Sequence, residues 1–283
     1  MQINLWDSNF RHSVCSVAWA TPEHVEYVRD RYRWKGITVF TDAWLINPVV
    51  DEVESTYKLG WLHEPGCLWP HLYGKILDYI GYPVDRPRHF DTILTYRKDF
   101  TLTYPGEFTW VPYGGCWVPR AEWGLHQKTK LVSMLYGEKV TTTGHQLRHA
   151  IGETFPQGID YYGVRGEAVN YSPETKIKVH KDYMFSVVVE TCRENWLFTE
   201  ILLDCFALGT IPVFWGCPEI DTLFDARGII AFVTVEVLSY ILPQLTPSLF
   251  AKMRPYALEN LKRVAEYAVT EDWLYEHVFQ RYV

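Results

Sequence analysis

The sequence predicts an α/β protein made of two similar halves, each a parallel β-sheet covered by helices. The clearest sign is residues 183–215, where an apolar run, a helix-like segment and a second apolar run follow one another. The first run, 184–189, is rich in β-branched residues, which is typical of a strand buried on both faces of a parallel sheet. Similar alternation recurs on both sides of residues 112–124, a Gly/Pro/aromatic stretch that interrupts it. This pattern predicts two Rossmann-like domains.

The middle segment of residues 183–215 has the spacing of a helix. Its apolar residues from Phe198 to Phe206 recur at i, i+3, i+4, i+7 and i+8, which forms one apolar face. Asn195 and Thr199 are both suitable caps for its start, and Gly209 is suited to its end. Strand, helix and strand in this order form a βαβ unit.

In the first half, strands and helices are expected to alternate in the same way. Pro22 follows Thr21, a suitable cap, so it would occupy the first turn of a helix over 22–34. The expected strands are 14–19, 37–40, 57–62, 90–95 and 108–111, and the expected helices are 22–34, 48–55 and 68–79.

The second half continues the alternation after the interruption. We therefore expect one domain over residues 1–125 and another over 126–283, with a ligand in the cleft between them. The expected strands are 131–136, 159–162, 184–189, 211–215 and 229–233. Besides the helix described above, the expected helices are 142–151, 218–224, 235–242, 247–268 and 272–282.

The amino-acid composition limits the kinds of binding partner that are expected. A chain of 283 residues that is 48% hydrophobic and 16% aromatic is expected to be globular, with most aromatic side chains in the core. Its formal net charge is −7 and it has no run of Lys or Arg, which argues against a nucleic-acid partner. No apolar run is long enough to cross a bilayer, and residues 1–13 do not resemble a signal peptide.

Several common site motifs are absent from the sequence. The 6 cysteines form no CxxC pair, so neither a zinc site nor a thioredoxin-like site is indicated, and we expect reduced thiols in a cytoplasmic protein. There is no GxGxxG after the first expected strand and no P-loop motif. No Asp-x-Asp occurs either, so a metal–diphosphate clamp is not indicated.

Polar residues follow the strand 184–189 at its carboxyl end. In open α/β sheets, ligands bind beyond the carboxyl ends of the strands and against helix amino-termini. Glu190, Arg193, Thr199 and Glu200 all come from that zone, so they are the candidate ligand-binding residues. Glu190 ends a buried strand, and it is either a site residue or a buried structural acceptor.

Three motifs in this stretch resemble those of one enzyme family. Residues 185–191 follow its F-x-x-x-x-E-N pattern, residues 197–201 its Y-x-T-E-K pattern, and residues 212–218 its P-V/I-x-x-G-x-P pattern. Upstream, residues 90–113 are similar to a segment F-D-x-x-x-x-Y-R-x-D that leads to V-P-Y, and residues 130–148 to a strand that leads into an Arg-bearing helix. Over roughly residues 57–235, the sequence resembles the α-fucosyltransferases, which are inverting glycosyltransferases.

The resemblance implies the GT-B arrangement of two Rossmann-like domains. It also implies that the second domain binds a nucleotide sugar, usually GDP-fucose, and that the first binds a glycan acceptor, with no metal or other cofactor required. Carried over by position, Arg148 would contact the diphosphate, Glu200 the ribose, and Glu64 would be the general base. Glu64 precedes a proline, so a surface turn is the alternative role for it.

The sequence departs from the family at three of these positions. Leu197 stands for the family's Tyr, Ile201 for its Lys, and Thr191 for its Asn. Arg193 or Lys181 could replace the missing cation. The departures leave two alternatives open: a nucleotide-sugar or carbohydrate-binding protein that kept the fold without turnover, and a scaffold whose βαβ unit is only core.

Overall fold

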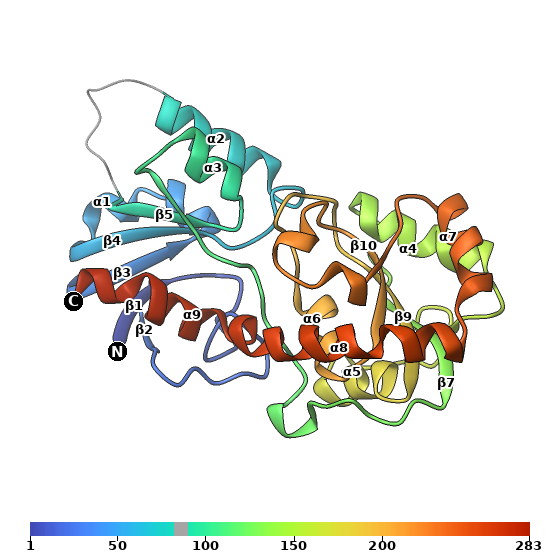
Figure 1. The fold of residues 1–283 in the computed structure, drawn as a ribbon. Helices are drawn as coiled ribbons and strands as arrows, with labels where there is room; N and C mark the ends of the chain where they lie inside the picture. Colours follow the sequence, from blue (N-terminus) through green and yellow to red (C-terminus); the bar gives the residue numbers. More distant parts are fainter. Residues whose placement is uncertain (82–89) are drawn as a thin grey trace. The chain divides into compact units, whose positions relative to one another are not determined.

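In the computed structural model, which describes residues 1–81 and 90–283, the chain divides into two compact units (Figure 1). Unit 1 comprises Met1–Tyr113 and Val269–Val283, and unit 2 comprises Gly114–Ala268. Each unit contains one sheet in which all paired strands are parallel, with helices packed on it. The predicted fold class, α/β with two Rossmann-like domains, is confirmed.

The sheet of unit 1 has the strand order β2-β1-β3-β4-β5-β6. The carboxyl halves of its central strands β3 and β4 are buried, while their amino-terminal halves are partly exposed. The polar residues that follow these strands therefore emerge from the buried part of the sheet. The strands are β1 (Gln2–Trp6), β2 (Glu26–Arg29), β3 (Arg33–Thr41), β4 (Glu54–Leu62), β5 (Thr92–Thr95) and β6 (Phe108–Trp110). Its described α-helices are α1 (Val49–Glu52), α2 (Pro70–Gly81), α3 (Lys98–Thr103) and α9 (Thr270–His277).

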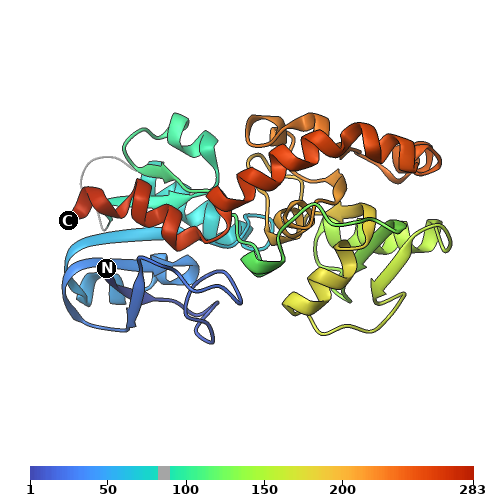
Figure 2. The same ribbon diagram turned by 60° about the horizontal axis from the view of Figure 1, so that its bottom comes forward.

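Two expectations for the first 34 residues are wrong. Residues 14–19 lie in a loop, and residues 22–34 contain β2 and the start of β3 instead of a helix. Figure 2 shows the loop in dark blue beyond β1, a strand that the sequence pattern did not reveal. The loop is held by tertiary contacts, since Arg29 donates to the carbonyl oxygens of Phe10 and Ser13 at 3.4 and 3.2 Å. Such contacts leave no periodicity in the sequence.

The sheet of unit 2 has the strand order β11-β10-β9-β7-β8. Its middle strands carry side chains with almost no exposure, among them Met134, Phe185, Ile211 and Val213. Burial of one such side chain contributes about 1.5–3 kcal/mol. The strands are β7 (Lys130–Tyr136), β8 (Asp160–Gly163), β9 (Tyr183–Val189), β10 (Ile211–Trp215) and β11 (Ile230–Ala231). The α-helices are α4 (Thr143–Thr154), α5 (Pro173–His180), α6 (Glu200–Ala207), α7 (Val235–Ile241) and α8 (Pro247–Tyr267).

The unit boundaries differ from the expected division into 1–125 and 126–283. Residues after Tyr113 belong to unit 2, because Asp204 on α6 accepts the backbone N–H groups of Trp117 and Val118 at 2.7 and 3.2 Å. Gly124 also donates to the carbonyl of Ala207, at 2.9 Å.

The last helix belongs to unit 1, although the sequence pattern placed it in the second domain. The buried carboxylate of Glu271 on α9 accepts the backbone N–H of Ser16 at 2.7 Å and the hydroxyl of Tyr27 at 3.3 Å. Thr270 donates to the carbonyl of Tyr113 at 2.8 Å, and the rings of Trp110 and Trp273 meet edge to face. These partners are more than 150 residues away in sequence, so local patterning could not reveal them.

Four of the six cysteines, Cys15, Cys116, Cys205 and Cys217, are buried free thiols. The expectation of reduced thiols is confirmed for these four. It is wrong for Cys67 and Cys192, neither of which has a free thiol. Within residues 1–81 and 90–283, no helix combines the length and apolar character needed to cross a bilayer.

Candidate functional site

At the carboxyl end of β9, a buried carboxylate supports the start of α6. Glu190 is fully buried and accepts both the backbone N–H and the hydroxyl of Thr199, each at 2.9 Å. Thr199 is the N-cap of α6, since its hydroxyl oxygen accepts the backbone N–H of Ile201 at 3.4 Å. Of the two caps suggested by the sequence, Thr199 is the one used, and Asn195 is not.

The environment of Glu190 is closely packed. Burial raises the pKa of Glu190 to about 7, although the hydrogen bonds from Thr199 act in the opposite direction. A Cβ on Gly216 would lie 2.6 Å from the Cγ of Glu190, so only glycine leaves room for this side chain. The sequence left two roles open for Glu190, a site residue or a buried structural acceptor. Its contacts with Thr199 are those of a buried acceptor that fixes the start of α6. Direct contact of Glu190 with a donor stays a prediction.

Helix α4 brings Arg148 to the same end of β9. The guanidinium of Arg148 donates through Nε at 2.9 Å and Nη2 at 2.5 Å to the carbonyl oxygen of Val189, the last residue of the strand. Burial lowers the pKa of Arg148, whereas the negative charges of Glu190 and Glu200 raise it. Arg148 is therefore a half-buried cation beside the two carboxylates that the sequence placed at this site.

The first turn of α4 approaches the loop after β9 very closely. The backbone N–H of Gly144 donates to the carbonyl of Thr191 at 3.0 Å, and a Cβ at this position would lie 1.9 Å from the carbonyl oxygen of Glu190. Next to it, His145 is buried, and burial followed by the charge of Arg148 lowers its pKa to about 4. His145 is thus neutral at pH 7, and Arg148 carries the positive charge.

Glu200, the first residue of α6, has a cationic partner that the sequence did not suggest. The Nζ of Lys176 on α5 lies 3.5 Å from Oε1 of Glu200 and 3.1 Å from Oδ2 of Asp204. The side chain of Lys176 is 2% exposed and that of Glu200 is 23% exposed. Glu200 therefore remains reachable by a ligand while one of its oxygens is held from within the unit.

The two replacement cations proposed from the sequence have different surroundings. Lys181 pairs with Glu122 at 2.8 Å, with both side chains 39% exposed. Arg193 is exposed in the loop between β9 and α6, and its contact with a donor stays a prediction. Lys176 was missed because helix α5 was not predicted. A signal for that helix was present, since Ser172 stands at its N-cap and Pro173 in its first turn.

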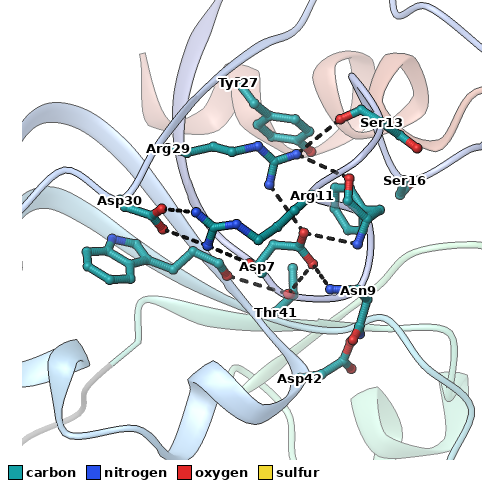
Figure 3. Close-up of polar contacts among 12 residues, drawn as sticks. Asp7, Asn9, Arg11, Ser13, Ser16, Tyr27, Arg29, Asp30, Thr41 and Asp42 are labelled. Carbon is teal, nitrogen blue, oxygen red and sulfur yellow. Dashed lines mark hydrogen bonds and ion pairs between the residues drawn. The ribbon is translucent and has the colours of Figure 1, made fainter.

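In unit 1, carboxylates follow the ends of neighbouring strands. Asp7 follows β1, Asp42 follows β3, and Glu64 follows β4 by two residues. One oxygen of Asp42 accepts the backbone N–H groups of His63 and Glu64 at 2.9 and 3.0 Å. The other accepts the side-chain amide of Asn9, and both of these residues are labelled in Figure 3. Burial raises the pKa of Asp42 to about 8, although the backbone N–H of Glu64 opposes this. Its backbone is in the left-handed region, with φ of 44°, which is strained for a residue with a Cβ.

Asp7 fixes the loop that follows β1. Its fully buried carboxylate accepts the backbone N–H groups of Asn9 and Phe10 at 2.9 and 3.1 Å and the hydroxyl of Thr41 at 3.0 Å (Figure 3). The guanidinium of Arg29 balances its charge at 3.2 Å. Since both oxygens of Asp7 have partners, its role is to hold this edge of the sheet in one arrangement.

Glu64 has a neutral histidine beside it. The side chain of Glu64 is 24% exposed, and its Oε1 lies 3.9 Å from Nδ1 of His63. Burial lowers the pKa of His63 to about 4, and its ring packs against those of Phe10, Trp61 and Tyr113. Glu64 thus has a fixed backbone and a partly exposed carboxylate, which are properties a general base requires. Catalysis by Glu64 stays a prediction.

Comparison with known proteins shows the fold. No family model and no curated protein matches the sequence. Among solved structures, an α1,3-fucosyltransferase with GDP-fucose is similar over 93% of this chain and 88% of its own, with 13% identity and a TM-score of 0.54. The trehalose-6-phosphate synthase OtsA is similar over 87% of this chain and 72% of its own, with 10% identity and a TM-score of 0.59. S. aureus TarM in complex with UDP matches 84% of this chain and 55% of its own, with 12% identity and a TM-score of 0.55.

The chain has a GT-B fold. This agrees with the arrangement that the sequence motifs implied, and it rests on neighbours that differ from one another in the reactions their names describe. At 10–13% identity these neighbours show the fold alone.

Proposed function

We propose that this GT-B protein is an inverting glycosyltransferase, with unit 2 binding a nucleotide-sugar donor and unit 1 a glycan acceptor. The observation that carries the proposal is the group of Arg148 and Glu200 at the capped start of α6, beyond the carboxyl end of β9. Ligands of doubly wound sheets bind at such an edge. The motif resemblance favours GDP-fucose as the donor, and the neighbour with GDP-fucose supports the same choice.

In the proposed reaction, an acceptor hydroxyl oxygen attacks the anomeric carbon of the donor. Its bond to that carbon forms while the bond from the carbon to the diphosphate oxygen breaks, and Glu64 accepts the hydroxyl proton. Negative charge grows on the departing diphosphate, and Arg148 and the amino-terminus of α6 stabilise it without a metal. Glu200 accepts hydrogen bonds from the ribose hydroxyls, which orients the donor for an in-line displacement.

A panel of nucleotide sugars tests this proposal. The full chain is incubated with each donor and a broad set of glycan acceptors in the presence of a chelator, and transfer and donor hydrolysis are measured beside Glu64→Ala and Glu200→Ala. We expect turnover with one donor, at least a 100-fold loss in Glu64→Ala, and weaker donor binding in Glu200→Ala. No turnover with any donor would contradict the enzyme proposal.

A second candidate is a nucleotide-sugar-binding protein without turnover. It is favoured by Ile201, which stands where the resembling family has its phosphate-binding lysine. A rise in melting temperature with a nucleotide, together with no transfer, would support it. If no nucleotide raises the melting temperature, both candidates fail.

A further inference from the structure

Helix α5 carries a lysine in an unusually enclosed position. Lys176 is 2% exposed, and a lysine this buried is rare unless it is paired. Its ammonium lies 3.1 Å from Asp204, 3.5 Å from Glu200 and 4.7 Å from the centre of the Trp117 ring. All three partners belong to unit 2.

The two carboxylates are on one face of α6, because Glu200 and Asp204 are four residues apart in a helix. Burial by itself would lower the pKa of Lys176, but Asp204 and Glu200 together raise it, so the ammonium is charged at pH 7. Asp204 has a second role, since its Oδ1 also accepts the N–H groups of Trp117 and Val118. The lysine is thereby anchored at Asp204 and reaches from there to Glu200.

Position 201 cannot supply a cation, because it is isoleucine. We propose that Lys176 is a positioning residue of the donor site: it holds the Glu200 carboxylate toward the ribose hydroxyls of a nucleoside diphosphate sugar from inside the unit. This rests on the proposed donor role of Glu200. Lys176 itself is too buried to contact the donor, so its effect is on ribose recognition.

The test compares nucleotides with and without the ribose hydroxyls. The full chain is titrated with GDP and UDP and with their 2′,3′-dideoxy forms, and dissociation constants are measured by calorimetry. In the wild type, the better-bound nucleotide should bind about 10-fold tighter than its dideoxy form, as expected for hydrogen bonds to a charged group. In Glu200→Gln, most of this difference in dissociation constant between the nucleotide and its dideoxy form should be lost.

Lys176→Met alone would leave Asp204 charged, buried and unpaired, which endangers folding. The decisive variant is therefore Lys176→Met combined with Asp204→Asn, in which the amide oxygen at 204 can still accept from Trp117 and Val118. We expect the ratio to fall to about 2 or less. Asp204→Asn alone turns an amide NH₂ toward the ammonium, which weakens the anchor of Lys176 but leaves its charge near Glu200, so the ratio should fall less than in the double variant. Lys181→Met at the surface should keep the ratio.

The outcomes separate the two proposals. If the double variant keeps the wild-type ratio, or if Asp204→Asn alone loses it as fully, the role of Lys176 is overturned while that of Glu200 stands. If the wild type binds the nucleotide and its dideoxy form equally well, the proposed donor role of Glu200 is wrong. The proposed role of Lys176, which rests on it, is then wrong as well. A double variant that is folded by circular dichroism, binds dideoxynucleotide as the wild type does and loses the ratio supports the proposal.

Discussion

In unit 1, the strands β1 and β3 end in carboxylates whose partners are mostly backbone N–H groups, with Arg29 as the cation of Asp7. In unit 2, Glu190 after β9 likewise accepts a backbone N–H and a hydroxyl, both from Thr199, but side-chain cations are added at this edge. Arg148 donates to the carbonyl of Val189, and Lys176 pairs with Glu200 at the start of α6. Two sheets of the same kind thus use the same edge differently. The first arrangement fixes loops and leaves Glu64 partly exposed. The second adds positive charge at the end of β9, where we propose that a diphosphate binds.

The largest expected effect concerns the exposed carboxylate of unit 1. Glu64→Gln should lower kcat by about 10²- to 10⁴-fold, because an amide cannot accept the acceptor's proton. The matched control is Glu54→Gln at the other end of the same strand, where Glu54 forms an exposed pair with Arg33. Steady-state kinetics check both variants. An equal loss of kcat in the two would mean that the carboxylate after the strand has no catalytic role that the one at its start lacks.

Removal of Asp7 should have the largest effect on stability. Asp7→Ala leaves Arg29 and the donors of the loop without their partner, and we expect a loss of about 3–5 kcal/mol in the free energy of unfolding. Asp30→Asn, which tolerates the positive φ of 58° at this position, breaks only the exposed ion pair with Arg11 and should cost about 1 kcal/mol or less. Urea denaturation measures both. Similar losses of unfolding free energy in the two variants would mean that the buried Asp7 stabilises the protein no more than an exposed ion pair does.

Glu190 should give unit 2 a distinct pH dependence. Because its pKa rises from 4.5 to about 7 on folding, its stabilising contribution is complete below about pH 4.5 and is lost as the pH rises through 7. Between these limits, the wild type should lose about 3 kcal/mol more than Glu190→Gln, which does not titrate. Unfolding free energies at pH 4.5 to 8 provide the test, and parallel curves for the two proteins would contradict it.

The smallest effect concerns the helix caps. Thr199→Ala removes the cap of α6 and a hydrogen bond to Glu190, so it should cost about 2 kcal/mol. Thr234→Ala removes a cap of α7 with an exposed contact to Val237, and it should cost about 1 kcal/mol. If the two losses measured by denaturation are equal, the bond to Glu190 adds nothing to the cap.

Where the local sequence pattern agrees with the tertiary structure, the helices and strands could be predicted from the sequence. The stretch β9–α6–β10 was predicted because its strands are buried on both faces and its helix has one apolar stripe. The positions of Glu190 and Glu200 at one edge followed from that topology, whereas Arg148 was placed there by the motif resemblance. Their roles toward a ligand are still predictions.

Other features could not be predicted, because their partners are distant in sequence. Lys176 is 24 and 28 residues from Glu200 and Asp204, and no spacing rule links them. Asp42 accepts hydrogen bonds from residues 21 and 22 positions away, and although aspartate is enriched at positive φ, most aspartates do not adopt it, so residue type alone does not predict it here. The same reason explains why residues 1–34 were assigned incorrectly.

The return of the last helix to unit 1 has a consequence for how the chain is made. The two ends of unit 2 are joined by hydrogen bonds, from Gly115 to the carbonyl of Tyr267 and from Cys116 to that of Ala268. Unit 2 can therefore close on itself as soon as residue 268 has left the ribosome, since domains fold as units during synthesis. The first residues of unit 1 precede unit 2, but they lack Glu271 and its contacts with Ser16 and Tyr27 until the residues after unit 2 emerge. Of these two units, the one whose translation starts first is thus the one completed later.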